Sequence, residues 1–297
     1  MQTTKVLLAT DLGFCSGVRR AVLETERSLA HHSIVASTDA LLHNVREMSR
    51  LRSLGLRSLE TLSREQLAET TVVLPAHGST SEERAILARS VPRVVDLTCP
   101  IVNAARQRVE ELVGAGLPVL IVGDGDHRET RYLMEGAGDS LVGVVGSVDD
   151  MEHLLRLPSR TGLVCQTTQT RENRDSILGW LAVHHVDVVE TSTLCPEVLR
   201  RQSSIAGLAA ACSAVLVLGD ASSANTRRSV LVASRHCSRA FLVSDAASVR
   251  SLGLVRGDTI GIASGTSCPD YAIRDALDVL RESLGRLMVS KEPQPRD

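Results

Sequence analysis

The sequence predicts an α/β fold built from parallel sheets. Short apolar runs alternate along the chain with stretches of helical periodicity, and polar turns separate them. Repeated strand–turn–helix units of this kind form parallel sheets with helices on their faces. In three places a strand ends close to a cysteine that begins a helix, at Cys15, Cys99 and Cys195. We therefore expect three similar α/β units that each contribute one cysteine to a common site.

The spacing of these cysteines sets the expected domain boundaries. Residues 1–98 would form a first domain with Cys15, residues 99–190 a second with Cys99, and residues 191–288 a third with Cys195. Residues 289–297 are polar and read as a frayed C-terminal tail.

The expected strands are the apolar, β-branched runs. In chain order they are Lys5–Ala9, Ser33–Ser37, Thr71–Ala76, Val94–Thr98, Leu117–Val122, Gly162–Cys165, Val188–Thr191, Ala214–Leu218 and Thr259–Ala263.

The expected helices follow the turns at the ends of these strands. The first begins after Cys15 and places Val18, Ala21, Val22 and Leu29 on one face. Thr80 and Glu83 have the spacing of a capping box, and a proline follows both Cys99 and Cys195, where the first helical position tolerates it. The last helix is expected from about Tyr271 to Leu287.

Composition narrows the class of protein. The 297 residues are 43% hydrophobic and 23% charged, as in ordinary globular proteins, and the formal net charge is −2. A nucleic-acid binder would usually show a basic excess and more aromatic residues, so we expect no nucleic-acid partner. No apolar run is long enough to cross a bilayer, and no signal-peptide core is present, so we expect a cytoplasmic protein with no membrane partner.

Seven widely scattered cysteines in such a chain favour reduced thiols or metal ligation over disulfides. Cys165, Cys212 and Cys237 lie in apolar contexts and read as small core residues. Cys15, Cys99 and Cys195 differ, since a thiol at a helix N-terminus is favoured as the thiolate. Cys268 also precedes a proline at a strand end, and the pattern alone leaves its role open.

Two metal centres are compatible with three such cysteines. Zinc would be satisfied by three cysteines and a histidine, but zinc ligands usually come in close pairs and no Cys-x-x-Cys occurs here. An iron–sulfur cluster held by three thiolates tolerates distant ligands and leaves one iron open.

Polar residues that suit catalysis and anion binding gather where the expected strands end. Ligands of open α/β sheets bind at the carboxyl ends of strands, and hydroxyls at helix N-termini can hold phosphate without lysine. The residues placed there are Cys15, His43, His77, Cys99, His127, Glu129, Thr167, Cys195, Ser222, Ser223 and Ser267. The set describes a metal site beside a phosphate site, with no fingerprint for bound NAD or ATP.

Nine short motifs then match a known family in order and spacing. They are Gly13-Phe14-Cys15-Ser16-Gly17-Val18, His43-Asn44, Ala76-His77-Gly78, Thr98-Cys99-Pro100, His127-x-Glu129, Gln166-Thr167-Thr168, Cys195 with Arg201-Gln202, Ser222-Ser223, and Gly265-Thr266-Ser267-x-Pro269-Asp270. Over nearly its whole length the chain resembles the LytB (IspH) family of 4-hydroxy-3-methylbut-2-enyl diphosphate reductases.

The resemblance implies three α/β domains in a trefoil around a central [4Fe-4S] cluster with three cysteine ligands and one open iron. By position, Cys15, Cys99 and Cys195 would be the ligands. The diphosphate would be held by His43, His77, His127, Ser222, Ser223, Asn225 and Ser267. Glu129 would deliver protons, and Thr167 would orient it and the substrate hydroxyl. The activity implied is reductive removal of an allylic hydroxyl, giving isopentenyl and dimethylallyl diphosphate, with electrons from a donor such as ferredoxin or flavodoxin.

Several positions depart from the family pattern around the expected substrate site. Ala224 replaces the usual asparagine after the paired serines, with Asn225 one step later; Val198 replaces a threonine, Arg128 a proline and Asp124 a frequent histidine. Cys268 stands where the family has a small residue. Two alternatives follow: a divergent paralogue acting on another phosphorylated substrate, or a non-catalytic iron–sulfur or zinc sensor.

Overall fold

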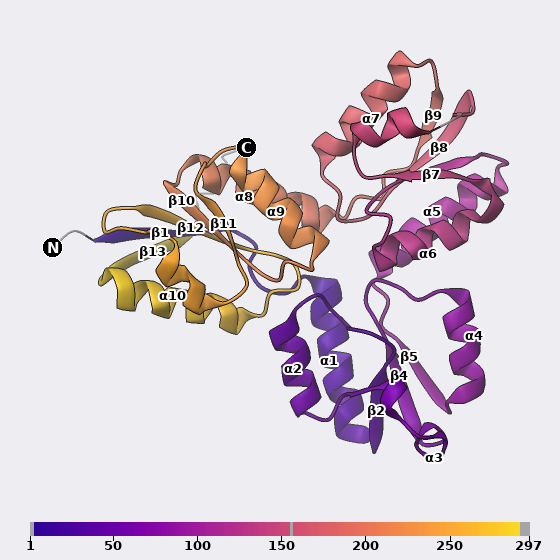
Figure 1. The fold of residues 1–297 in the computed structure, drawn as a ribbon, viewed down its shortest axis with the longest axis horizontal. Helices are drawn as coiled ribbons and strands as arrows, with labels where there is room; N and C mark the ends of the chain where they lie inside the picture. Colours follow the sequence, from indigo (N-terminus) through magenta and orange to yellow (C-terminus); the bar gives the residue numbers. More distant parts are fainter. Residues whose placement is uncertain (1–2, 155–156, 292–297) are drawn as a thin grey trace. The chain divides into compact units, whose positions relative to one another are not determined.

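The structure is a computed structural model that describes residues 3–154 and 157–291 (Figure 1). Its described residues divide into two compact units. Unit 1 comprises residues 1–16, 43–47 and 196–297, and unit 2 comprises residues 17–42 and 48–195. Unit 1 contains one parallel sheet, sheet A, and unit 2 contains two, sheets B and C. The predicted α/β class with three parallel sheets is confirmed.

Sheet A has the strand order β11-β10-β12-β1-β13. Its strands are β1 (Thr4–Leu8), β10 (Ala214–Leu218), β11 (Ala240–Val243), β12 (Thr259–Ser264) and β13 (Leu287–Lys291). Its helices are α8 (Pro196–Ala210), α9 (Ala224–Ser234), the 3₁₀ helix η4 (Ala246–Ser251) and α10 (Asp270–Leu284). Alternate strand residues face opposite sides, so Val6 and Leu216 pack with the α10 side while Leu7 and Val217 pack with α8 and α9.

Sheet B has the order β3-β2-β4-β5. Its elements are α1 (Ser16–His31), β2 (Ile34–Ser37), α2 (Val45–Ser53), β3 (Arg57–Ser58), η1 (Leu59–Thr61), α3 (Arg64–Leu67), β4 (Thr70–Leu74), α4 (Ser81–Ser90) and β5 (Arg93–Asp96). The predicted capping box of Thr80 and Glu83 is present at the start of α4. Leu87 of α4 packs on Val72 and Leu74 of the central strand β4.

Sheet C has the order β7-β6-β8-β9. Its elements are α5 (Pro100–Gly114), β6 (Val119–Val122), α6 (Arg128–Ala137), η2 (Gly138–Ser140), β7 (Leu141–Val145), η3 (Val148–His153), β8 (Arg160–Cys165), α7 (Arg171–Val183) and β9 (Asp187–Glu190). In Figure 1, α5 and α6 lie side by side on this sheet. Val109 and Leu133 from these helices share a core with Ile121 and Val164.

The three sheets share one topology. In sheets B and C the strands lie in the order second, first, third, fourth along the chain. Sheet A repeats that order with β10, β11 and β12, and β1 takes the fourth place. The predicted threefold repeat is therefore real, but the predicted first segment 1–98 supplies strands to two sheets, because β1 belongs to sheet A.

The C-terminal segment also differs from expectation. Gly285, at φ +84°, ends α10, and the chain re-enters sheet A as β13, which pairs in parallel with β1. Val289, Ser290 and Lys291 are thus in a strand where a frayed tail was predicted. The rest of the predicted tail, 292–297, lies outside the described residues.

All nine predicted strands are present, with bounds shifted by a few residues. The strands that sequence patterning did not anticipate are β3, β7, β11 and β13, which are less buried than the strands beside them. Among the described helices, none combines the length and the apolar character needed to span a bilayer.

Candidate functional site

Cys15, Cys99 and Cys195 occupy equivalent corners of the three sheets. Each follows the fourth strand of its sheet, β1, β5 or β9. Each cysteine N–H donates to a carbonyl two residues beyond the end of the neighbouring strand: Cys15 to Thr266, Cys99 to Ala76 and Cys195 to Thr167, at 3.0, 2.9 and 2.9 Å. The repeated hydrogen bond shows that the three corners are built in the same way.

The Cys15 corner is fixed within unit 1. Gly13, at φ +77°, turns the backbone, and its N–H donates to Ser264 Oγ at 2.9 Å. The buried Arg201 donates to the Gly13 carbonyl at 2.9 Å and pairs with Glu197. Burial alone would raise the pKa of Glu197, but hydrogen bonds from Ser16 and the charge of Arg201 bring it below its usual value. The corner is therefore held by charged groups in their ionised forms.

The Cys99 corner is fixed within unit 2 by two arginines. Arg20 of α1 donates to the carbonyls of Leu97 and Thr98 at 3.0 and 2.6 Å. Arg84 of α4 donates to the hydroxyl of Thr98 at 3.2 Å. The loop that carries Cys99 is thus bonded from two helices before Pro100 starts α5.

The Cys195 corner is fixed by a threonine. The Thr193 hydroxyl accepts from the N–H of Cys165 at 2.9 Å and donates to its carbonyl at 2.6 Å. That residue ends β8, so the loop before Cys195 is tied to the same strand end that accepts its N–H.

The remaining cysteines have a different environment. Cys165, Cys237 and Cys268 are buried, Cys212 packs against the core of sheet A, and none of the seven cysteines forms a disulfide. Burial raises the pKa of the Cys165 and Cys268 thiols to about 12, which keeps them protonated at neutral pH. Cys15, Cys99 and Cys195 are half-buried, as a ligating thiolate requires.

The donor chemistry of the corners fits an iron–sulfur cluster. Cys15 belongs to unit 1 and Cys99 and Cys195 to unit 2. Neither unit, among its described residues, gathers three or more histidine, cysteine or acidic side chains into a metal site of its own. Three thiols on separate sheets suit a cluster with distant ligands better than zinc.

Unit 1 brings together five of the predicted anion-binding residues, which come from the loops after β10 and β12 and from the segment 43–47. They are His43, Ser222, Ser223, Asn225 and Ser267. The Ser267 hydroxyl donates to the His43 carbonyl at 2.9 Å, and Ser223 caps α9 by accepting from the N–H of Thr226 at 3.3 Å. The N-terminus of α9 suits a negatively charged ligand.

Ser222 and Asn225 differ in their hydrogen-bond partners. The Ser222 hydroxyl donates to Asp220 at 2.7 Å. Burial works against ionisation of Asp220, but hydrogen bonds from Ser222 and Val45 hold its pKa below the usual value. Asn225 is 3% exposed, and neither its amide nitrogen nor its oxygen has a partner among the described residues. A buried amide with no partner is costly, so Asn225 is suited to receive a ligand.

Unit 2 brings together the two other predicted histidines. His77 follows β4 and His127 caps α6, and their ring centroids are 6.3 Å apart with the rings 71° from parallel. His127 Nδ1 accepts from the Glu129 N–H at 3.1 Å, so a neutral ring carries its proton on Nε2. The His127 ring can therefore donate from Nε2 to an anion near the start of α6.

Glu129 and Thr167, the predicted proton donor and its orienting residue, are in contact. Both side chains are buried, and Glu129 Oε1 accepts from the main-chain N–H of Thr167 at 2.6 Å. The contact from Thr167 is made by its main-chain N–H. Thr167 therefore connects the predicted proton donor Glu129 to the predicted ligand Cys195, because its carbonyl accepts the Cys195 N–H.

The sequence alone assigned no structural role to three residues near these histidines. Gly78, at φ +93°, lies against the ring of Tyr132, where an added Cβ would approach to 2.8 Å. The Ser79 hydroxyl is buried with no partner among the described residues. Arg128 pairs with Asp39 and Glu83. In the sequence, Gly78 is part of the motif Ala76-His77-Gly78 and Arg128 stands between His127 and Glu129, whereas Ser79 carries no signal.

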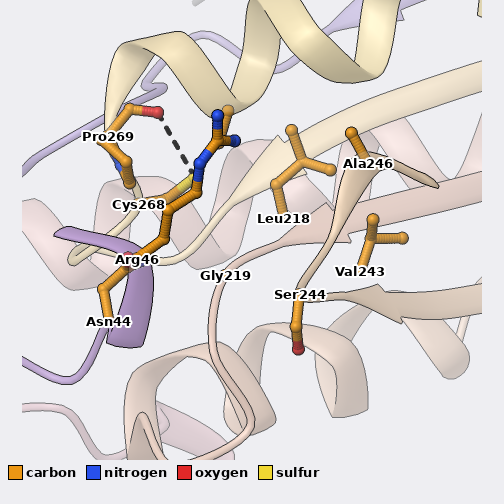
Figure 2. Close-up of a pocket in the computed structure, with 10 residues that line it drawn as sticks. Asn44, Arg46, Leu218, Gly219, Val243, Ser244, Ala246, Cys268 and Pro269 are labelled. Carbon is orange, nitrogen blue, oxygen red and sulfur yellow. Dashed lines mark hydrogen bonds between the residues drawn. The ribbon is translucent and has the colours of Figure 1, made fainter. Parts of the chain in front are cut away.

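Cys268 lines a small cavity in unit 1. The cavity lies at the carboxyl ends of β10 and β11, between Asn44, Arg46 and the turn at Cys268 and Pro269 (Figure 2). Its volume of about 20 Å³ admits a single water molecule, so it is no substrate pocket. Cys268 is fully buried in the α10 core, with its thiol directed to the Pro269 carbonyl.

Comparison with known proteins gives one consistent result. The family model described as LytB protein matches residues 6–281. A 4-hydroxy-3-methylbut-2-enyl diphosphate reductase from Kosmotoga olearia is 31% identical over 285 residues, covering 93% of this chain and 95% of the relative. A reductase of the same name from Geobacter metallireducens is 29% identical over 278 residues, covering 94% and 97%.

Solved structures agree with the fold. A structure of (E)-4-hydroxy-3-methyl-but-2-enyl diphosphate reductase, described as the terminal enzyme of the non-mevalonate pathway, is 28% identical. It has a TM-score of 0.67 and covers 94% of this chain and 100% of its own. The E-1-hydroxy-2-methyl-but-2-enyl-4-diphosphate reductase from Plasmodium falciparum has a TM-score of 0.86 at 21% identity, covering 99% and 94%. At that identity the likeness concerns the fold.

Proposed function

Because the chain belongs to the LytB family, we propose that it reduces 4-hydroxy-3-methylbut-2-enyl diphosphate to isopentenyl and dimethylallyl diphosphate in isoprenoid biosynthesis. Family membership confirms the resemblance stated from the motifs and the expectation of an oxidoreductase. The observation that carries the proposal is the threefold cysteine corner, with one identical N–H to carbonyl bond in each sheet.

We assign Cys15, Cys99 and Cys195 as the ligands of a [4Fe-4S] cluster. When bound, such a cluster supplies single electrons and a Lewis-acidic iron with an open position. The chain supplies three half-buried thiols on helix N-termini, each on a loop fixed by hydrogen bonds. A fixed loop would hold each cysteine in the same conformation in the oxidised and the reduced form of the cluster.

We assign the anion-binding role to two sets of donors. In unit 1 these are His43, Ser222, Ser223, Asn225 and Ser267, and the start of α9 adds main-chain N–H groups. In unit 2 they are His77 and His127. A diphosphate bound by imidazole, amide and hydroxyl donors needs no lysine, which fits a chain whose only lysines are Lys5 and Lys291.

Glu129 is assigned as the proton donor. The reaction replaces a C–O bond by a C–H bond, so it consumes two electrons and two protons and releases water. The carboxyl of Glu129 is buried and oriented by the Thr167 N–H, which suits it to hold and transfer a proton. The electrons would come from an external protein such as ferredoxin or flavodoxin.

Anaerobic turnover tests this proposal directly. Cluster-loaded protein with a chemical reductant and 4-hydroxy-3-methylbut-2-enyl diphosphate should yield isopentenyl and dimethylallyl diphosphate. A preparation that holds its cluster but forms neither product would rule out this substrate and favour a divergent paralogue.

A further inference from the structure

Arg128 is the first residue of α6 and lies between His127 and Glu129. Its side chain pairs with two carboxylates from the part of unit 2 that contains sheet B. Its Nε lies 2.5 Å from Asp39 Oδ2, in the loop after β2, and its Nη1 lies 3.3 Å from Glu83 Oε1, in the first turn of α4. The guanidinium therefore links α6, which packs on sheet C, to the loop after β2 and to α4, which belong to the sheet B part of unit 2.

The charge balance indicates where Arg128 acts. A cation at a helix N-terminus is unfavourable because it meets the positive end of the macrodipole. Asp39 and Glu83 compensate that cost, and Arg128 is only 28% exposed. Glu83 is itself held in place, because its other oxygen accepts the N–H of Thr80 in the capping box at 3.2 Å. Both acceptors leave little of the guanidinium's charge to attract a third anion.

Two further contacts join α6 to the sheet B part of unit 2. The Ser81 N–H donates to Glu135 at 2.8 Å, and Arg106 pairs with that carboxylate at 3.0 Å. The ring of Tyr132 packs against Gly78, the residue after His77. Arg84 and Arg106 lie over the same ring, 5.9 and 4.8 Å from its centroid. The middle of α6 therefore packs on the turn that carries His77 and on the start of α4.

We propose that Arg128 is a positioning residue that sets the spacing between His77 and His127 and does not itself bind the substrate anion. The inference rests on the proposed function, since it takes the two imidazoles as donors to a diphosphate. Their ring centroids are 6.3 Å apart, and Arg128, directly after His127 in the chain, joins the start of α6 to Asp39 and Glu83.

The test is the affinity of cluster-loaded protein for inorganic diphosphate, measured by calorimetry. The variants are Arg128→Gln, Asp39→Asn and the double variant. Arg131→Gln is the matched control, because Arg131 is on the same helix and its ion pair, at 3.7 Å, is with the exposed Asp126. Arg128→Lys keeps the charge without the fork and serves if Arg128→Gln does not fold.

The signs of the effects separate the two roles. If Arg128 positions α6, both single variants weaken diphosphate binding by about fivefold, as expected for a half-exposed ion pair. The double variant then binds no more weakly than Arg128→Gln alone, because that change already breaks the pair with Asp39. If Arg128 binds the anion, Asp39→Asn releases it and tightens binding while Arg128→Gln weakens it. Tighter binding in Asp39→Asn, additive losses, or no change would overturn the proposal.

A second measurement needs no ligand. Hydrogen exchange of peptides spanning residues 76–84 and 124–132 should quicken in Arg128→Gln and in Asp39→Asn, and not in Arg131→Gln. Unchanged exchange in both peptides would overturn the positioning role. If wild-type protein fails to turn over the substrate but exchange still responds, the proposed function is wrong while the positioning role stands.

Discussion

The two units carry different kinds of polar group. Unit 1 offers hydroxyls and an amide around the start of α9, with one cysteine corner. Unit 2 offers two histidines, a buried glutamate and two cysteine corners. Apart from His43, the unit 1 donors are hydroxyls and an amide, whereas the unit 2 groups are imidazoles and a carboxyl.

Both units offer donors to an anion, but only unit 2 also offers the buried carboxyl that we assign to proton transfer. Hydroxyl and amide donors can bind an anion but do not exchange a proton at neutral pH, whereas a carboxyl can also hold and transfer one. The contrast is useful because substitutions in unit 1 should change binding, while substitutions in unit 2 should also change the rate of chemistry.

The largest expected effect concerns the cysteine corners. Cys15→Ser, Cys99→Ser and Cys195→Ser should each lose the cluster, because a serine hydroxyl is a poor ligand for iron in this setting. Cys237→Ser, in the core of sheet A, is the control and should keep its iron. Iron and sulfide content per chain measures the effect. Equal iron in all four variants would show that the corners are not the ligands.

Glu129→Gln should come next in size. The amide keeps the shape and can still accept from the Thr167 N–H, but it cannot deliver a proton. We expect kcat to fall by about a hundredfold or more, with iron content and diphosphate affinity close to wild type. Steady-state kinetics under anaerobic conditions measures it. A near-normal kcat would remove Glu129 from the proton-transfer role.

Replacing Asn225 should have a smaller effect, which is favourable for thermal stability and unfavourable for diphosphate binding. Because its buried amide has no partner among the described residues, Asn225→Leu should raise Tm while weakening diphosphate binding about tenfold. Ser234→Ala, at the exposed far end of α9, should change neither. Calorimetry and thermal unfolding measure the two properties. Lower Tm with unchanged binding would show that the amide serves packing alone.

The smallest expected effect is on acid stability in unit 1. Hydrogen bonds hold the pKa of Asp220 below its ordinary 3.8 despite burial. A carboxyl with a lowered folded pKa stabilises the fold above the unfolded value, and this stability is lost as pH falls through the folded value. Asp220→Asn should therefore lower Tm by about 2 °C near pH 6, and the difference should shrink below pH 3.8. Thermal scans from pH 7 to pH 3 test this, and a gap that widens in acid would contradict it.

Sequence patterning predicted the strands that are buried on both faces, such as Ala214–Leu218, because an apolar run of that length has few other stable placements. It missed β7 and β11, which are edge strands with partly exposed residues and a weaker pattern. It also misread Leu287–Lys291, whose burial is low and whose place in sheet A depends on pairing with β1. Pairing partners far apart in the chain leave no local signal.

The candidate site shows the same division. Residues at strand ends were found because parallel sheets bring those ends to one edge. The pairing of Glu129 with the Thr167 backbone could not be found, since main-chain donors are invisible in a sequence. Nor could the ties from Arg128 to Asp39 and Glu83, which join residues 45 or more positions apart.

The most direct test of the central claim is electron paramagnetic resonance of anaerobically reduced wild-type protein, before and after addition of 4-hydroxy-3-methylbut-2-enyl diphosphate. Three thiolate ligands and an open iron predict a [4Fe-4S] signal that changes when the substrate is added. A protein that holds zinc, or a cluster whose signal is indifferent to the substrate, would contradict the account.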